Sequence, residues 1–193
     1  MYAKKILLAL LLLSPGLIQA QDAALSQQEI EDLLGVKIRF ATHIAFNPSI
    51  VRAVEQQNSQ KIPLAEIKKR DDDWKGAGDN MIALIRETTQ NDIARYFQRR
   101  VENNVAIDEV FLTDNQGANV AAYPPTSDYW QGDEEKWTAS FNNGNGKVFI
   151  GPLEYDDSTK KTQVQISAPI YSNDNTIGVL VLGVSVDYLQ DKQ

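Results

Sequence analysis

Apolar residues recur at every third or fourth position between residues 25 and 101, and the spacing changes to every second position from Ile107 onward. A period near 3.6 is typical of helices that bury one face, and a period of 2 is typical of half-buried strands. The pattern therefore predicts a helical first half followed by an antiparallel sheet, which is an α+β fold.

Local signals divide the helical half into four predicted helices. Ser26 and Glu29 have the spacing of a capping box at the start of the first helix. Asn47-Pro48 ends or kinks this helix, and Pro48 suits the first turn of the next because a first-turn N–H needs no helical partner. The remaining expected segments are a short second helix around 50–54, a third over 63–74, a break over 76–78 and a fourth over 80–101.

Five strands are predicted in the second half, together with a short helix around residues 134–140. The strand after residue 161 alternates most clearly, since Val164, Ile166, Ala168 and Ile170 point one way while polar residues point the other. Turn residues separate neighbouring strands and predict hairpins. The predicted strands are 109–113, 119–123, 147–155, 162–171 and 176–187.

The first twenty residues have the layout of a secretory signal peptide. Lys4 and Lys5 precede the apolar run Ile6–Leu13, and Ala20 is a small residue at the expected cleavage position. An uncleaved N-terminal anchor is the alternative. Cleavage would leave an exported, periplasmic protein with a helical region over 21–106 and a sheet region over 107–193 of the same domain.

Composition excludes several kinds of chemistry. The 193-residue chain has no cysteine and a single histidine, His43, so disulfides, cysteine metal sites and multi-histidine metal centres are excluded. The formal charge of −7 becomes −9 without Lys4 and Lys5, which argues against nucleic acid as a partner. No catalytic set, metal site or cofactor motif is predicted, and we interpret the charge run 68–73 as a solvated surface.

The order of these elements resembles the extracellular Cache, or PDC-type, PAS-like sensor domains. The resemblance implies a five-stranded sheet with a long N-terminal helix packed along it, and a ligand pocket between the sheet and the segment after its second strand. It also implies a homodimer contact through the N-terminal helix. The segments that carry the resemblance are 110–117, 123–130, 165–171 and 177–187.

The sequence departs from receptors of this family because it ends six residues after Asp187, where they continue into a membrane helix and an output module. We therefore expect a small-molecule sensor that acts through a membrane-bound kinase, cyclase or chemoreceptor. The alternative is a ligand-independent interaction module that modulates such a protein and fills the pocket with its own side chains.

Aromatic residues are concentrated in the predicted sheet region. Tyr and Trp can bury ligand surface while their polar atoms form hydrogen bonds, so we expect several of them to line the pocket. Phe111, Phe141 and Phe149 are expected in the core instead. The predicted pocket aromatics are Tyr123, Tyr129, Trp130, Trp137 and Tyr155.

Asp128 stands where the amino-acid-binding branch of the family has an arginine that binds the ligand carboxylate, five residues after Tyr123 and two before Trp130. An aspartate beside aromatic faces suits an amine or a quaternary ammonium group. The resemblance therefore predicts a cationic or neutral ligand. Alternatively, Asp128 caps the following turn. The family also has an aspartate that binds the ligand amine. The candidates for its position here are Asp174, Ser172 and Asn173.

Overall fold

The computed structural model describes residues 27–78, 82–156 and 159–185. Three predicted features lie outside these residues: the signal peptide, Ser26 of the capping box, and the end of the last strand at Asp187. Within them, no helix combines the length and apolar character required to cross a membrane.

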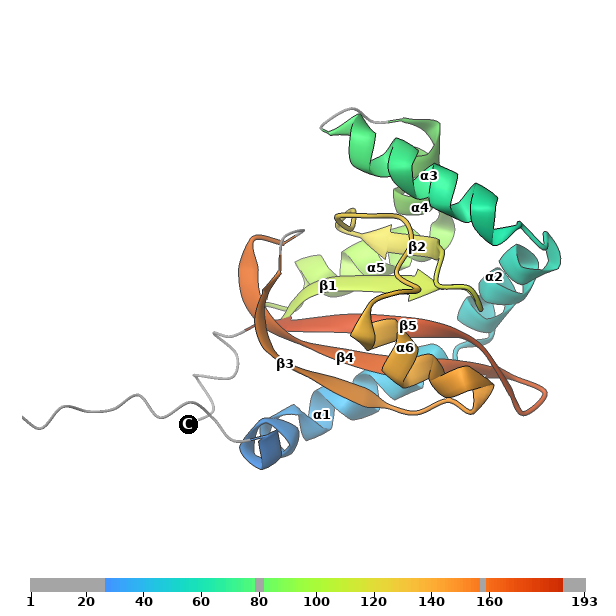
Figure 1. The fold of residues 1–193 in the computed structure, drawn as a ribbon. Helices are drawn as coiled ribbons and strands as arrows, with labels where there is room; N and C mark the ends of the chain where they lie inside the picture. The colour runs from blue at the N-terminus through green and yellow to red at the C-terminus, as the bar shows by residue number, and fades with distance from the viewer. Residues whose placement is uncertain (1–26, 79–81, 157–158, 186–193) are drawn as a thin grey trace, which may run out of the picture.

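Five antiparallel strands form one sheet in the order β2-β1-β5-β4-β3, which confirms the predicted α+β class (Figure 1). Each strand begins or ends within about two residues of its prediction. The long central pair β4 and β5 is joined by a two-residue turn in which Asn173 and Asp174 both have positive φ, as a type I′ hairpin requires. The strands are β1 Ile107–Thr113, β2 Asn119–Tyr123, β3 Phe149–Asp156, β4 Lys161–Ser172 and β5 Asn175–Ser185.

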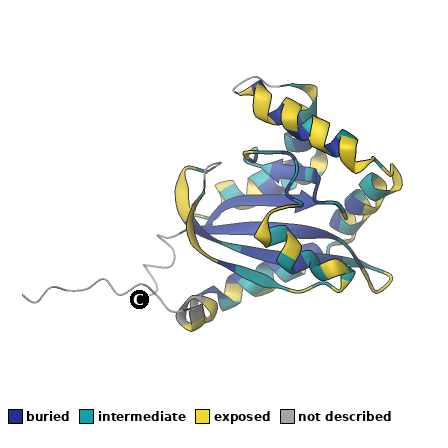
Figure 2. Cartoon of the chain, in the orientation of Figure 1, coloured by how far each residue is buried: buried dark blue, intermediate teal, exposed yellow. Residues whose placement is uncertain are grey.

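The long helix α1, Gln27–Ala45, lies along one face of the sheet, as the resemblance implied (Figure 1). Its apolar positions at helical spacing form the main core with helices α2 (Pro48–Ser59) and α5 (Asp92–Glu102) and the apolar side of β4. Figure 2 shows the buried sheet between exposed outer helix faces. The central residues of this core are Leu34, Ala41, Ile44, Val54, Phe97, Val164, Ile166 and Ile170.

The predicted single helix over 80–101 is wrong, because the structure has two helices there, α4 (Ala83–Thr89) and α5. Asn91 separates them. Its Oδ1 accepts from Ala94 N at 2.9 Å and caps α5, while its Nδ2 donates to Glu87 O at 2.9 Å and to Val120 O at 3.0 Å. An asparagine side chain that bonds nearby backbone groups competes with continuous helical hydrogen bonding, which explains the interruption.

Helix α3, Leu64–Ala77, is longer than predicted, because it continues through Gly76. Gly78 follows as the C-cap residue, with φ 53°. It packs on the loop that follows β2. A smaller core joins the helix to this loop and includes Ile67, Trp74, Ala118 and Tyr129.

The second face of the sheet carries helix α6, Glu135–Phe141, which packs on β3, β4 and β5, with β3 as the edge strand beside it (Figure 1). Trp137 and Phe141 of α6 stack with ring centroids 4.7 Å apart over buried Phe111. The predicted alternation of β4 holds, but its polar side is also buried, since Gln163 is 1% exposed and Ser167 is fully buried. Polar residues therefore lie beneath α6 and β3.

Candidate ligand site

A hollow of about 240 Å³ lies on the α6 side of the sheet. The start of α6 forms one wall, β3 forms the opposite wall, and the polar side of β4 forms part of the floor. We call it the sheet hollow. Its lining residues are Ser127, Glu134, Glu135, Lys136, Phe149, Gly151, Pro152, Glu154, Tyr155, Asp156, Gln163 and Gln165.

A buried acid, Glu109 of β1, lies beside this hollow and bonds to two of its lining residues. Glu109 pairs with Gly183 of β5, and Gly183 pairs in turn with Gln165 of β4, so the three residues form one row across the sheet. Gln163 Nε2 and Gln165 Nε2 donate to Glu109 Oε1 at 2.6 and 2.7 Å. The strand order therefore brings together residues that are more than fifty positions apart in sequence.

Gly183 of β5 allows this contact because it has no side chain between the neighbouring strands β1 and β4. A Cβ atom at this position would fall within 3.0 Å of both Gln163 Oε1 and Glu109 Cγ. Glycine normally weakens a strand interior, and a common reason for its presence is the close approach of another group. Here the approaching groups are the side chains that form the polar cluster, which we call the Glu109 cluster: Glu109, Gln163 and Gln165.

Burial raises the pKa of Glu109 from 4.5 to about 7, and the negative charge of Asp156 contributes in the same direction. The hydrogen bonds from Gln165 and Gln163 and the positive charge of Lys136 oppose this increase but do not cancel it. A carboxyl group that is 1% exposed and titrates near neutrality is unusual outside functional sites.

The site is rich in acceptors and negative charge. Glu134, Glu135, Glu154 and Asp156 line the sheet hollow, where Lys136 is the single basic residue. Gln163 Oε1 is buried without a hydrogen-bond partner within the described chain. No group of three or more metal-ligating side chains is found in that part of the chain either. Carboxylate and amide oxygens accept hydrogen bonds, so the acceptors gathered here suit a group that carries several N–H donors.

No protein-family model matches the sequence, and no curated protein matches it. Among solved structures, the chain is similar to the sensor domain of E. coli DcuS, with 13% identity, a TM-score of 0.52, and coverage of 86% of this chain and 97% of that one. The chain has the fold of the PDC-type sensor domains. The resemblance expected from the order of the elements is thus confirmed at the level of the fold.

Two further solved structures have lower structural similarity. The sensory domain of the Campylobacter jejuni chemoreceptor Tlp3 with isoleucine bound has 16% identity and a TM-score of 0.42, with 86% of this chain and 66% of that one covered. The V. cholerae histidine kinase DctB sensor domain has 14% identity and a TM-score of 0.42, with 85% and 57% covered. The chain therefore spans less than two thirds of these two domains.

The residues that the sequence predicted to bind the ligand lie in several different parts of the structure. Tyr155 lines the sheet hollow and is exposed. Asp128 lies beneath α3, where its carboxylate accepts from Gln131 Nε2 and lies 3.8 Å from Lys75 Nζ. Burial raises the pKa of Asp128, and the nearby charge of Asp71 raises it further. Its carboxylate accepts from a side chain in this arrangement, and Asp128 does not line the sheet hollow.

Tyr129 and Trp130 are held against α3 by Asp71. The Asp71 Oδ1 atom accepts from the backbone N–H groups of Tyr129 and Trp130 at 2.9 and 3.0 Å, and its Oδ2 accepts from Lys75 at 2.7 Å. Our interpretation of residues 68–73 as a solvated surface is therefore wrong at Asp71, which is 5% exposed. Lys68 lies over the Trp130 ring, 4.6 Å from its centroid, and Trp130 Nε1 donates to Gln116 O.

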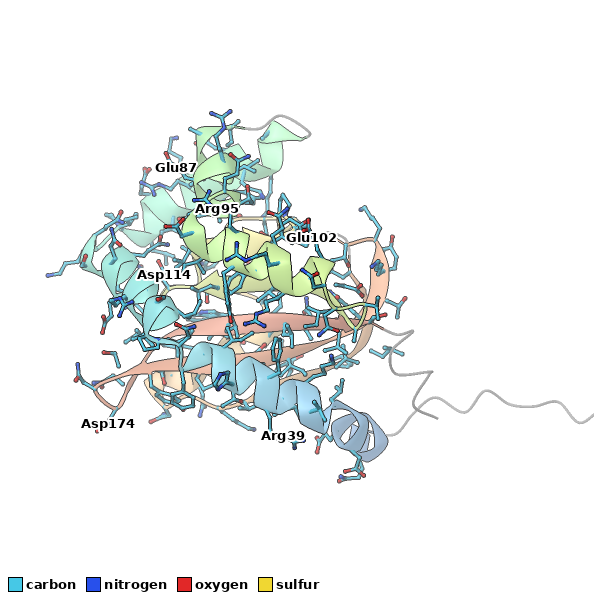
Figure 3. The ribbon with its side chains drawn as sticks, turned by 180° about the vertical axis from the view of Figure 1, so that it is seen from behind. Arg39, Glu87, Arg95, Glu102, Asp114 and Asp174 are labelled. Atoms are coloured by element: carbon cyan, nitrogen blue, oxygen red, sulfur yellow. The ribbon has the colours of Figure 1, made fainter. Side chains whose placement is uncertain are left out.

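The other predicted residues lie away from the sheet hollow. The Tyr123 hydroxyl donates to Glu102 Oε1 at 2.9 Å, on the side of α5. Trp137 packs with Phe141 over the sheet. Asp174 is at the tip of the β4–β5 hairpin (Figure 3).

Sequence reasoning missed Glu109, Gln163, Gln165 and Gly183 as members of one site. Three signals were present: an acid that directly precedes the apolar run Val110–Leu112, two glutamines on the same side of one strand, and a glycine in the middle of another. Each signal alone is weak. Only the strand order β1-β5-β4 shows that they meet.

Proposed function

We propose that this chain is a sensor domain that binds a small cationic or neutral molecule with several N–H donors, and that a protonated amine is its preferred ligand. The Glu109 cluster carries this proposal, because it presents a buried carboxylate and an unpartnered amide oxygen beside a hollow lined by acids. Asp128 was the residue from which sequence reasoning reached a cationic ligand, and the Glu109 cluster supports the same class of ligand from a different position.

An ammonium group has three N–H donors and a full positive charge, so it complements grouped carbonyl and carboxylate oxygens. The attraction to Glu109 is stronger inside the protein than in water because the local dielectric constant is lower. Pockets for drug-sized ligands have volumes of about 300–1,000 Å³. The sheet hollow, at about 240 Å³, is below this range and fits an amine of a few heavy atoms.

The sensory part of the proposal rests on the PDC-type fold and on the polar hollow that the fold encloses. We propose a periplasmic location and a membrane-bound kinase, cyclase or chemoreceptor as the partner that receives the signal. Contact between two copies through α1 remains a prediction.

The test is calorimetric titration of the purified protein with ethylamine, ethanolamine and putrescine, and with propionate as an anion of similar size. We expect saturable binding of at least one amine and none of propionate. Glu109→Gln should weaken amine binding at least tenfold, because it removes the charge and keeps the shape. Glu31→Gln on exposed α1 removes an equal charge on the other face and should have no effect.

Absence of amine binding, or equal binding by the wild-type protein and Glu109→Gln, would contradict the proposal. One observation favours the ligand-independent interaction module in that case: Trp130 and Trp137 are packed against other parts of the protein and line none of the described hollows. That alternative predicts that the Glu109 cluster affects stability only.

A further inference from the structure

A second hollow, of about 370 Å³, lies between helices α2, α3, α4 and α5 and the strand β2. We call it the helix hollow. It shares no lining residue with the sheet hollow. Its volume lies within the range of about 300–1,000 Å³ that is usual for small-molecule sites. Glu87 of α4 lines this hollow, and Figure 3 shows it on the same side of the molecule as Arg95 of α5.

Side-chain amides dominate the polar lining of the helix hollow. Gln56 and Gln57 lie on the last turns of α2, and Gln60 is the C-cap residue that follows them, so the three amides lie side by side at the end of the helix. Asn91 and Asn119 add two amides from α5's cap and from β2. An amide carries a donor and an acceptor next to each other, and a hydroxyl group also both donates and accepts. A row of amides therefore matches a molecule with several hydroxyl groups.

The inner wall is fixed before any ligand arrives. Tyr129 is 2% exposed, and its ring packs against Trp74 with ring centroids 5.9 Å apart. Gln57 Nε2 donates to Asp114 Oδ2 at 3.2 Å and to Asn119 O at 3.3 Å. A binding wall with its polar groups already oriented loses less conformational freedom when a ligand binds.

Charges around the helix hollow are largely paired within the protein. Arg70 Nε donates to Glu66 Oε1 at 3.1 Å, and Arg95 binds Asp92 at 2.6 Å. Glu87 is exposed at the edge. An anionic ligand would meet Glu87 and Asp92, and a cationic ligand would meet Arg70, so an uncharged ligand is favoured over both.

Apolar surface completes the hollow. Leu84, Ile93 and Val120 line it together with the amides. Sugars and cyclic polyols present C–H groups on one side and hydroxyl groups at their edges, so they use both kinds of surface. We propose that the helix hollow is a second binding site, separate from the proposed amine site, for a neutral, hydroxyl-rich molecule of monosaccharide size.

The experiment follows backbone amide signals of the ¹⁵N-labelled protein by NMR during titration with D-glucose, D-ribose and myo-inositol. D-gluconate and D-glucosamine serve as charged probes with a glucose-like skeleton. We expect saturable shifts from at least one neutral probe at residues 53–60 and 88–93, and weaker shifts from both charged probes.

The variant Gln56→Ala/Gln60→Ala removes two exposed amides, one within α2 and one at its C-cap; alanine is compatible with a helix and keeps the backbone N–H that makes the cap bonds. Binding of the neutral probe should weaken about tenfold, as expected for two lost hydrogen bonds. Gln28→Ala, an exposed glutamine on α1, is the matched control and should leave binding unchanged. Glu109→Gln should also leave it unchanged, which separates this site from the amine site.

Three results would overturn the proposal: no saturable shift with any neutral probe, tighter binding of either charged probe as measured at residues 53–60 and 88–93, or shifts confined to α6 and β3. Binding that is unchanged in Gln56→Ala/Gln60→Ala would also overturn it. The circular dichroism spectrum and thermal midpoint of each variant show whether it is folded.

Discussion

At the scale of single residues, Glu109 is costly to the folded state at neutral pH. A carboxylate that leaves water for a buried position loses its hydration, and here two glutamine amides compensate for only part of that loss. Well-packed apolar residues in place of such a cluster often leave the free energy of unfolding unchanged or increase it. Stability alone therefore does not explain the cluster. Its position beside a hollow gives the cost a functional reason.

The pKa of Glu109 leads to a prediction about stability. Because the folded-state pKa is about 7 and the unfolded value is near 4.5, folding favours the protonated acid. Its contribution to stability is complete below pH 4.5 and is lost as the pH rises through about 7. Glu109→Gln should therefore gain stability relative to wild type between pH 4.5 and 7, by up to about 3 kcal/mol.

Urea denaturation of both proteins from pH 4 to pH 8 measures this difference. Titrating groups that do not interact with Glu109 affect both proteins equally and cancel in the comparison. A difference in unfolding free energy that stays constant across this range would show that Glu109 has an ordinary pKa.

Gly183 provides a second residue-scale prediction. Gly183→Ala should lower the free energy of unfolding by about 1–3 kcal/mol, because the new methyl group overlaps the Glu109 cluster. Gly151→Ala on β3 is the matched control, since its Cβ would lie 3.5 Å from the nearest of its neighbours at ordinary contact distance. Urea denaturation at pH 7 measures both. Equal effects at the two glycines would disprove the steric role of Gly183.

At the scale of elements, α3 fixes the conformation of the loop after β2. Asp71 binds two backbone N–H groups of that loop, and Trp74 Nε1 donates to Thr126 O at 2.9 Å. The loop lies between the two hollows, with Ser127 in the lining of one and Tyr129 in the lining of the other. The charge run 68–73 of this predicted helix was interpreted as a solvated surface, but its Asp71 holds the loop that lines both hollows in place.

This arrangement predicts the effect of Asp71→Ala. The substitution leaves the N–H groups of Tyr129 and Trp130 without their acceptor, and each buried unsatisfied group costs about 1–3 kcal/mol. We expect a loss of unfolding free energy of at least about 2 kcal/mol. Hydrogen exchange at these two amides should become faster. Asp72→Ala, at an exposed neighbouring position, should change neither. Exchange rates that stay unchanged in Asp71→Ala would contradict the assigned role.

At the scale of the whole molecule, the sheet separates two environments. One face forms an apolar core with α1, and the other carries the Glu109 cluster beneath α6 and β3. The net charge of −7 adds a negative potential over the whole surface, which favours the approach of cations.

Amine binding should consequently depend on pH. Protons and the amine compete for ionised Glu109, so affinity should fall as the pH drops below about 7, by up to tenfold per pH unit. Ethylamine stays charged throughout because its pKa is close to that of lysine, about 10.4. Titration calorimetry at pH 6, 7 and 8 tests this. Affinity that is independent of pH in the wild-type protein would show that Glu109 does not bind the amine.

The sequence by itself determined the α+β class, the order of the elements and the alternation of β4. These features depend on side-chain periodicity, which is a local property of the chain. It also singled out Asp128, Tyr129 and Trp130, but as residues of a ligand pocket, whereas the structure packs them against α3. The sequence predicted one helix over 80–101, where the structure has two. Asn91 caps the second helix and also donates to Val120 O on β2, a contact that helical periodicity does not reveal.

Tertiary structure alone decided which polar groups share a site. Glu109 contacts Gln163 and Gln165 only because β5 pairs with both β1 and β4 and has a glycine, Gly183, in the same row of the sheet. Asp71 reaches Tyr129 across 58 positions of sequence. Such contacts depend on strand order and helix placement, which follow from burial of the whole apolar surface at once. No local pattern encodes them, because each partner alone is an ordinary polar residue.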